Sequence, residues 1–184
     1  MLYLKHEVQQ TPLAAQKPAA AGPPSAEQVG AIIGRKASVE VTLEIEGGPE
    51  MTIKAPRVLV VDDDAGARML CAFHLQGEGL EVIEAADGRG GLTRARRENP
   101  DLVVTDVAMP GLDGFEFAEA LRGEEGTARI PLIFLSGERG PDNEARAHAL
   151  GALAYMTKPF DPADFVKLVT GVLDRLRPRS VTAD

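Results

Sequence analysis

The chain has 184 residues, 44% hydrophobic and 26% charged, a balance typical of a globular protein with a sizeable core. Its net charge is −8, almost all of it in residues 56–184, which argues against direct nucleic-acid binding because that function requires a basic surface. The single cysteine excludes an intrachain disulfide, and the sequence contains no signal-peptide or membrane-spanning pattern. We therefore expect a cytoplasmic protein that does not associate with membranes.

Residues 1–55 differ in composition from the rest and are expected to form an N-terminal extension. A Pro/Ala-rich stretch at about 9–26 is typical of a linker or flexible tail, because it offers little to bury. Residues 27–54 predict a short helix and then a β-hairpin, since apolar and polar residues alternate strictly over 39–46 and a Gly-Gly-Pro turn follows. Translation starting at Met51 is an alternative that would leave this region out of the protein.

The predicted hairpin needs a cover, because two strands alone are marginally stable in water. Its apolar face would lie on the following domain, on a second copy of the chain in a homodimer, or on a separate partner. An accessory element without chemistry of its own is the simplest interpretation.

Residues 56–178 are expected to form one α/β domain, followed by a short tail at 179–184. Apolar runs typical of buried strands occur at 58–61, 80–83, 102–104, 132–135 and 152–156. Between them lie segments of helical length and polarity, and a last amphipathic helix begins after Asp161 and ends before Pro178. This alternation predicts a doubly wound parallel sheet with helices on both faces.

Two of the predicted helices have features that weaken a helix. The one at 87–99 contains three glycines, each costing about 1 kcal/mol relative to alanine. The fourth helix, at about 143–150, offers mainly alanines and Leu150 to a core, so we expect it to move most readily.

Polar residues follow four of the predicted strands, at the edge where open α/β sheets bind ligands. They are Asp62, Asp63 and Asp64 after the first strand, Asp106 after the third, Ser136 after the fourth and Lys158 after the fifth. Carboxylates gathered in this way repel one another unless a cation lies between them, and their oxygen atoms suit Mg²⁺. With a lysine and a hydroxyl group, the set has the parts that phosphoryl transfer requires. Asp64 is expected to cap the following helix rather than to bind metal.

Four motifs resemble the receiver domain of bacterial two-component response regulators, similar to the stand-alone chemotaxis regulator. They are Val-Val-Asp-Asp-Asp at 60–64, Thr-Asp-Val-Ala-Met-Pro-Gly-Leu-Asp-Gly at 105–114, Phe-Leu-Ser-Gly at 134–137 and Tyr-Met-Thr-Lys-Pro-Phe at 155–160. The resemblance covers about two thirds of the chain. It implies a flavodoxin-like fold with five parallel strands in the order 2-1-3-4-5 and five helices.

The resemblance further implies the acceptor and the metal site. Asp106 would accept a phosphoryl group. Mg²⁺ (or Mn²⁺) would be held by Asp62, Asp63, Asp106 and the backbone carbonyl of Ala108.

Three other residues receive roles by the same resemblance. Lys158 would pair with the phosphoryl group, aimed by a cis bond to Pro159. Ser136 would move to bond a phosphoryl oxygen, and Tyr155 would swing into the space that it leaves. Ala108 and Glu138 depart from common choices at positions that tune the lifetime of the phosphoryl group, so that lifetime stays open.

The hypothesis is a phosphoryl-accepting switch that is not an enzyme beyond assisting its own phosphorylation and dephosphorylation. Its phosphodonor would be a histidine kinase or phosphotransfer protein, and a downstream protein would bind the fourth helix, fifth strand and fifth helix. One alternative is a docking adaptor of the same fold that is not phosphorylated. A remote one is a haloacid-dehalogenase-like phosphatase, which would leave Asp106 and the turn after it unexplained.

Overall fold

The computed structural model describes residues 41–43, 51–137 and 140–176, and the chain divides into two units at residues 1–54 and 55–184. In the first unit, β1 (Val41–Leu43) and β2 (Met51–Ile53) pair antiparallel, as the predicted hairpin requires, but β1 is shorter than the alternating run. The Pro/Ala-rich stretch, the short helix, Glu138 and the C-terminal tail lie outside the described residues.

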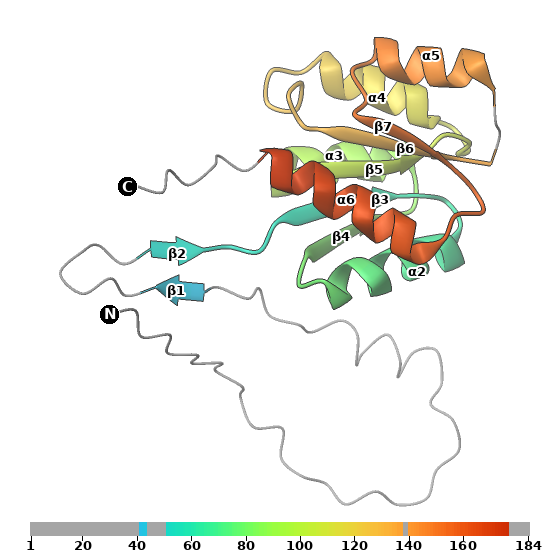
Figure 1. Cartoon of the computed structure of the whole chain (residues 1–184). Helices are drawn as coiled ribbons and strands as arrows, with labels where there is room; N and C mark the ends of the chain where they lie inside the picture. Colours follow the sequence, from blue (N-terminus) through green and yellow to red (C-terminus); the bar gives the residue numbers. More distant parts are fainter. Residues whose placement is uncertain (1–40, 44–50, 138–139, 177–184) are drawn as a thin grey trace, which may run out of the picture. The chain divides into compact units, whose positions relative to one another are not determined.

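The second unit is built around a five-stranded parallel sheet (Figure 1). Its strands are β3 (Arg57–Val61), β4 (Glu81–Ala85), β5 (Leu102–Asp106), β6 (Leu132–Ser136) and β7 (Ala154–Thr157). They lie in the order β4-β3-β5-β6-β7, and every neighbouring pair is parallel. This is the order 2-1-3-4-5 that the resemblance implies, and the flavodoxin-like fold is confirmed.

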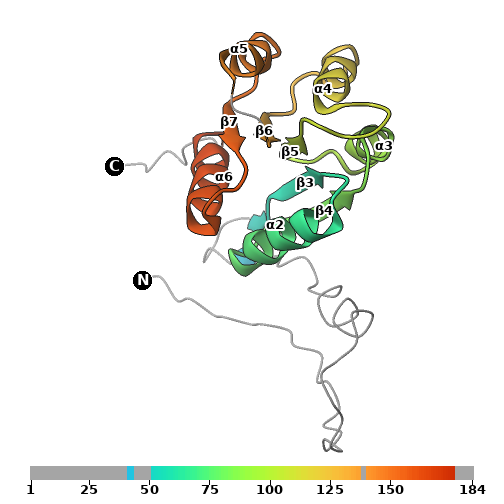
Figure 2. The ribbon, with the colours of Figure 1, turned by 90° about the vertical axis from the view of Figure 1, so that its right-hand side faces the viewer.

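Helices α2 to α6 cover the two faces of this sheet (Figures 1 and 2). They are α2 (Ala65–Gly77), α3 (Gly88–Glu98), α4 (Gly114–Arg122), α5 (Pro141–Ala149) and α6 (Pro162–Leu176). Helices α2 and α6 share one apolar core, where Leu75 and Phe165 pack on the sheet, and α3, α4 and α5 share the other. Both faces of the central strands are therefore buried, which explains their continuous apolar runs. Within the described ranges, no helix is long and apolar enough to cross a membrane.

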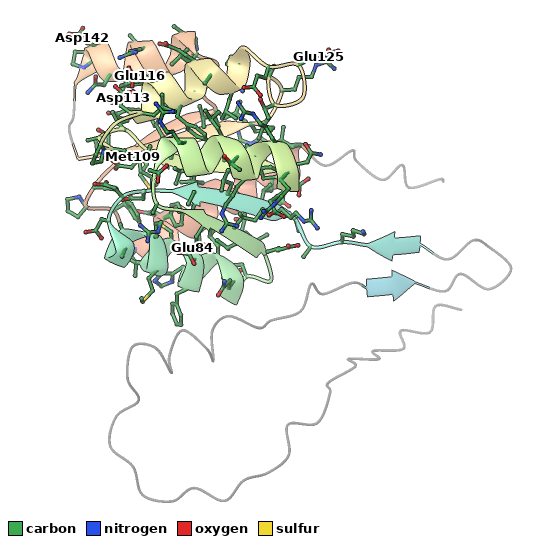
Figure 3. The ribbon with its side chains drawn as sticks, turned by 180° about the vertical axis from the view of Figure 1, so that it is seen from behind. Glu84, Met109, Asp113, Glu116, Glu125 and Asp142 are labelled. Atoms are coloured by element: carbon green, nitrogen blue, oxygen red, sulfur yellow. The ribbon has the colours of Figure 1, made fainter. Side chains whose placement is uncertain are left out.

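Side-chain caps fix where the helices next to the sheet edge begin. The Asp64 carboxylate accepts a hydrogen bond from the Ala67 N–H at 2.6 Å, which confirms the predicted cap. At the start of α4, Asp113 and Glu116 each accept a hydrogen bond from the other's main-chain N–H (Figure 3). The turns after β3 and β5 are consequently well defined.

The glycines of α3 were expected only to weaken this helix, but two of them are needed for close packing. A Cβ on Gly91 would lie 3.0 Å from the Phe117 ring and 3.1 Å from a methyl group of Val61. A Cβ on Gly88 would lie 2.7 Å from the main-chain oxygen of Leu112. These residues let α3 approach the sheet and α4 closely, so tertiary contacts offset its poor helix propensity.

Helix α5 is held by little apolar area, as predicted for the fourth helix of the domain. Ala147 is its one buried residue. The Arg146 guanidinium lies 4.4 Å over the centre of the Phe115 ring and pairs with Glu119 at 3.0 Å. These surface contacts add modest stability, so α5 can shift without exposing much of the core.

Candidate functional site

The carboxyl ends of the strands bring the predicted polar residues to one edge of the sheet. Asp106 is the last residue of β5 and lies opposite Leu135 of β6, and Ser136 lies opposite Thr157 at the end of β7. Asp62 and Lys158 directly follow β3 and β7. Residues from four strands therefore meet at this edge, as expected for a parallel sheet.

The centre of the site is an ammonium group shared by two carboxylates. Lys158 Nζ donates a hydrogen bond to Asp62 Oδ2 at 2.6 Å and another to Asp106 Oδ1. The side chains of Asp62 and Asp106 are only 2% and 6% exposed, so each carboxylate needs a compensating charge. The peptide bond from Lys158 to Pro159 is cis, as the resemblance implies.

Main-chain hydrogen bonds hold these side chains in place. The Asp64 N–H donates to Asp62 Oδ1 at 2.9 Å, which orients that carboxylate. The Lys158 N–H donates to the Ser136 carbonyl at 2.7 Å, which ties the turn after β7 to β6. The arrangement is therefore preorganised rather than assembled from mobile loops.

The remaining predicted residues surround this centre. Asp63 and Ala108 are exposed on the turns that follow β3 and β5. Ser136 is 2% exposed, and Tyr155 is half-buried against the core beneath α3, α4 and α5. Their individual roles stay predictions.

The electrostatics of the two central groups differ. Burial raises the pKa of Asp106 above its usual value, although the hydrogen bond from Lys158 and its charge act in the opposite direction. Burial acts to lower the pKa of Lys158, but the hydrogen bonds to Asp106 and Asp62 raise it overall. The lysine thus stays charged at neutral pH, whereas ionising Asp106 costs folding free energy.

We expect Asp106→Asn to stabilise the metal-free protein more at pH 7 than at about pH 4. Because the folded-state pKa of Asp106 is raised, the wild type loses stability as the pH rises from the ordinary aspartate pKa through the folded-state value. Asparagine has no such loss. Urea unfolding in EDTA at the two pH values measures the difference, with the exposed Asp174→Asn as control. An Asp106→Asn benefit that is constant, or larger at low pH, would contradict this.

The oxygen atoms at this edge of the sheet could serve as ligands of a divalent cation. Among the described residues, no three Asp, Glu, His or Cys side chains are close enough to hold a metal ion by themselves. The buried Asp62 and Asp106 carboxylates nevertheless already share one positive charge, and they present the oxygen ligands that Mg²⁺ prefers. Since Mg²⁺ usually keeps several water ligands, these residues fit such an ion, with a main-chain carbonyl and water completing its coordination.

The sequence interpretation missed two residues at this edge. Arg68 Nη1 donates to the Asp62 carbonyl at 2.7 Å. The sequence feature that could have indicated this role is an arginine near a helix N-terminus, where the helix dipole disfavours a positive charge. Gly114 is the second, because a Cβ there would lie 2.0 Å from the Asp106 carbonyl oxygen. Nothing in the sequence pattern alone indicated that approach.

Comparison with known proteins agrees with this geometry. The family described as "Response regulator receiver domain" matches residues 58–170. The chain is 33% identical over 127 residues to the phosphate regulon transcriptional regulatory protein of Escherichia coli, covering 69% of this chain and 56% of that protein. It is 35% identical over 120 residues to a DNA-binding dual master transcriptional regulator of Synechocystis, covering 65% and 50%. The chain thus spans about half the length of the curated relatives it matches.

A solved structure matches over nearly its whole length. The chemotaxis response regulator of Vibrio cholerae superposes with a TM-score of 0.61 at 36% sequence identity. The match covers 64% of this chain and 98% of that one.

Proposed function

Because the chain belongs to the response regulator receiver family, we propose that Asp106 accepts a phosphoryl group from a histidine kinase or phosphotransfer protein. Members of this family are signalling domains rather than classical enzymes. The observation that carries the proposal is the buried carboxylate pair of Asp62 and Asp106 around the Lys158 ammonium. It combines a nucleophile with the charges that a phosphoryl group requires.

The chemical step follows from these groups. A carboxylate oxygen of Asp106 attacks phosphorus, and the bond from phosphorus to the donor's imidazole nitrogen breaks, with its electron pair leaving on the imidazole. The product is an acyl phosphate. Lys158 and the Ser136 hydroxyl stabilise the phosphoryl oxygens. Asp62, Asp63, Asp106 and the Ala108 carbonyl would hold Mg²⁺, which would supply positive charge to the phosphoryl oxygens. The same residues would assist dephosphorylation.

The output is proposed to be a change of the surface formed by α5, β7 and α6. Ser136 would move toward the phosphoryl group and Tyr155 inward, which biases a two-state equilibrium. Support comes from α5, which buries only Ala147, and from β7, whose residues are all half-buried. A downstream protein that prefers one state would bind this surface.

The direct test uses acetyl phosphate as donor and the intact mass of the full chain as readout. We expect a phosphoryl adduct on the wild type with Mg²⁺, none with EDTA and none on Asp106→Asn. Asp174→Asn, an exposed charge-matched control, should label like the wild type. A wild type that binds Mg²⁺ but accepts no phosphoryl group from either acetyl phosphate or a phosphohistidine donor would contradict the proposal and favour the docking adaptor.

The other expectations about partners and location stay predictions. One relative is a DNA-binding regulator by name, but the chain spans about half of it, so its DNA binding is not transferred. The acidic charge of residues 56–184 supports signalling by protein contact instead. A cytoplasmic location and a homodimer through the N-terminal extension also stay predictions.

A further inference from the structure

We propose that Arg68 is a positioning residue that fixes the turn carrying Asp62 and Asp63 in the geometry required for a divalent cation. This inference rests on the proposed function, because it concerns the same acidic site. The side-chain hydrogen bonds and the ion pair of Arg68 go to Asp62, Asp63 and Glu84, and not to Asp106. Arg68 acts through the main chain of its neighbours.

The guanidinium of Arg68 spans the turn between β3 and α2. Its Nη1 donates to the main-chain oxygen of Asp62 at 2.7 Å and to that of Asp63 at 3.3 Å. Its Nε lies 3.8 Å from Oε2 of Glu84 on β4, labelled in Figure 3. With 17% of the side chain exposed, the guanidinium is packed against the turn rather than extended into solvent.

Asp62 is thereby held through its main chain as well as its side chain. Its N–H donates to the Ala85 carbonyl at 3.2 Å, and its carbonyl accepts from Arg68. Its Oδ1 accepts from the Asp64 N–H of the same turn. Rotation of the peptide planes in this turn would move both acidic side chains, so the arginine fixes their starting positions.

The position of Arg68 in its helix supports a specific role for this contact. It lies in the first turn after the Asp64 cap, where a positive charge opposes the helix dipole. A basic residue there is unfavourable for the helix itself. Its two carbonyl contacts and the nearby Glu84 carboxylate are what stabilise it at this place.

Charge and positioning predict opposite effects on cation binding. A guanidinium close to the acidic site repels a divalent cation, so charge alone predicts that removing Arg68 tightens binding. Positioning predicts weaker binding, because a cation would then have to order the turn itself. Loss of outer contacts that orient metal ligands typically weakens metal binding 10- to 100-fold.

The test is the Kd for Mn²⁺ alone, measured by electron paramagnetic resonance on the full chain without a phosphodonor. We expect Arg68→Met, which keeps the aliphatic stem, to raise the Kd about tenfold. Arg68→Lys keeps the charge but loses the planar set of N–H donors of the guanidinium, and should raise the Kd about threefold. Arg94→Met, which removes a partly exposed arginine on α3, should stay within about twofold of the wild type.

Thermal unfolding without metal shows whether each variant is folded. A Kd for Arg68→Met equal to or below that of the wild type overturns the proposal. If that variant does not fold, Arg68→Lys decides alone, because its charge is unchanged and any rise must come from geometry. A wild type that binds no Mn²⁺ overturns both the metal site and the role of Arg68, whereas equal binding by wild type and variants overturns only the latter.

Discussion

Replacing Gly114 with alanine is expected to lower the free energy of unfolding by about 3 kcal/mol or more. The added Cβ would lie 2.0 Å from the main-chain oxygen of Asp106 and 2.9 Å from Cα of Val107. Both neighbours are backbone atoms, so no side-chain rotation relieves the clash. The turn between β5 and α4 would have to open, which also breaks the hydrogen bond from the Gly114 N–H to the Val107 carbonyl.

Urea denaturation of the metal-free protein measures this effect. The matched control is Gly171→Ala in the middle of α6, where a Cβ would meet nothing within 4 Å. That variant should gain roughly 0.5–1 kcal/mol, because alanine favours the helix and restricts the unfolded chain. A Gly114→Ala protein within 1 kcal/mol of the wild type would show that the turn relaxes easily and that the close approach to Asp106 is unimportant.

Replacing Lys158 with methionine is expected to destabilise the metal-free protein by about 3 kcal/mol at neutral pH. The substitution leaves the buried carboxylates of Asp62 and Asp106 without the ammonium that they share. Because the pKa of Lys158 is raised in the folded state, its contribution is fully present below the ordinary lysine pKa and is lost only at strongly alkaline pH. Removing the ammonium also raises the pKa of Asp106 further, because Lys158 lowers that pKa in the wild type, so the loss should not become smaller between about pH 6 and 9.

Magnesium should reverse much of this loss, because a divalent cation replaces the missing positive charge. The variant should consequently gain more stability from Mg²⁺ than the wild type does, while phosphorylation stays strongly reduced. Lys167→Met, at an exposed position of α6, is the matched control and should be close to neutral. Equal stability of the Lys158→Met variant and the wild type in EDTA, or no extra gain with Mg²⁺, would contradict the charge-sharing account.

The sequence predicted where the site lies better than it predicted which residues contact one another there. Apolar runs that end in Asp62 and Asp106 identified the sheet edge, because buried parallel strands have an unmistakable composition. Asp64 was predicted as a cap from its place before a helix. The ends of the strands were predicted less accurately. Strand β4 lies at Glu81–Ala85 rather than at 80–83, because its pairing with β3 continues through the polar Glu84 to Ala85.

Contacts between distant elements were beyond sequence reasoning. The Lys158 ammonium meets Asp62 across 96 positions of the chain, and only the folded sheet brings them to 2.6 Å. The glycines of α3 illustrate the same limit, since local propensity indicated weakness where Gly91 packs tightly on Phe117. Arg68 belongs to none of the four sequence motifs, and its role depends on the main-chain path of the turn that precedes it.

The most direct measurement is the chemical location of the phosphoryl group. Borohydride converts an aspartyl phosphate to homoserine, and trypsin then separates the two acidic motifs, because Asp106 lies in the peptide 98–122 and Asp62 in the peptide 58–68. We predict homoserine at position 106 of the Mg²⁺- and acetyl phosphate-treated wild type, and at no other aspartate. Homoserine at Asp62, Asp63 or Asp64 would contradict the proposed acceptor and support the phosphatase-like alternative.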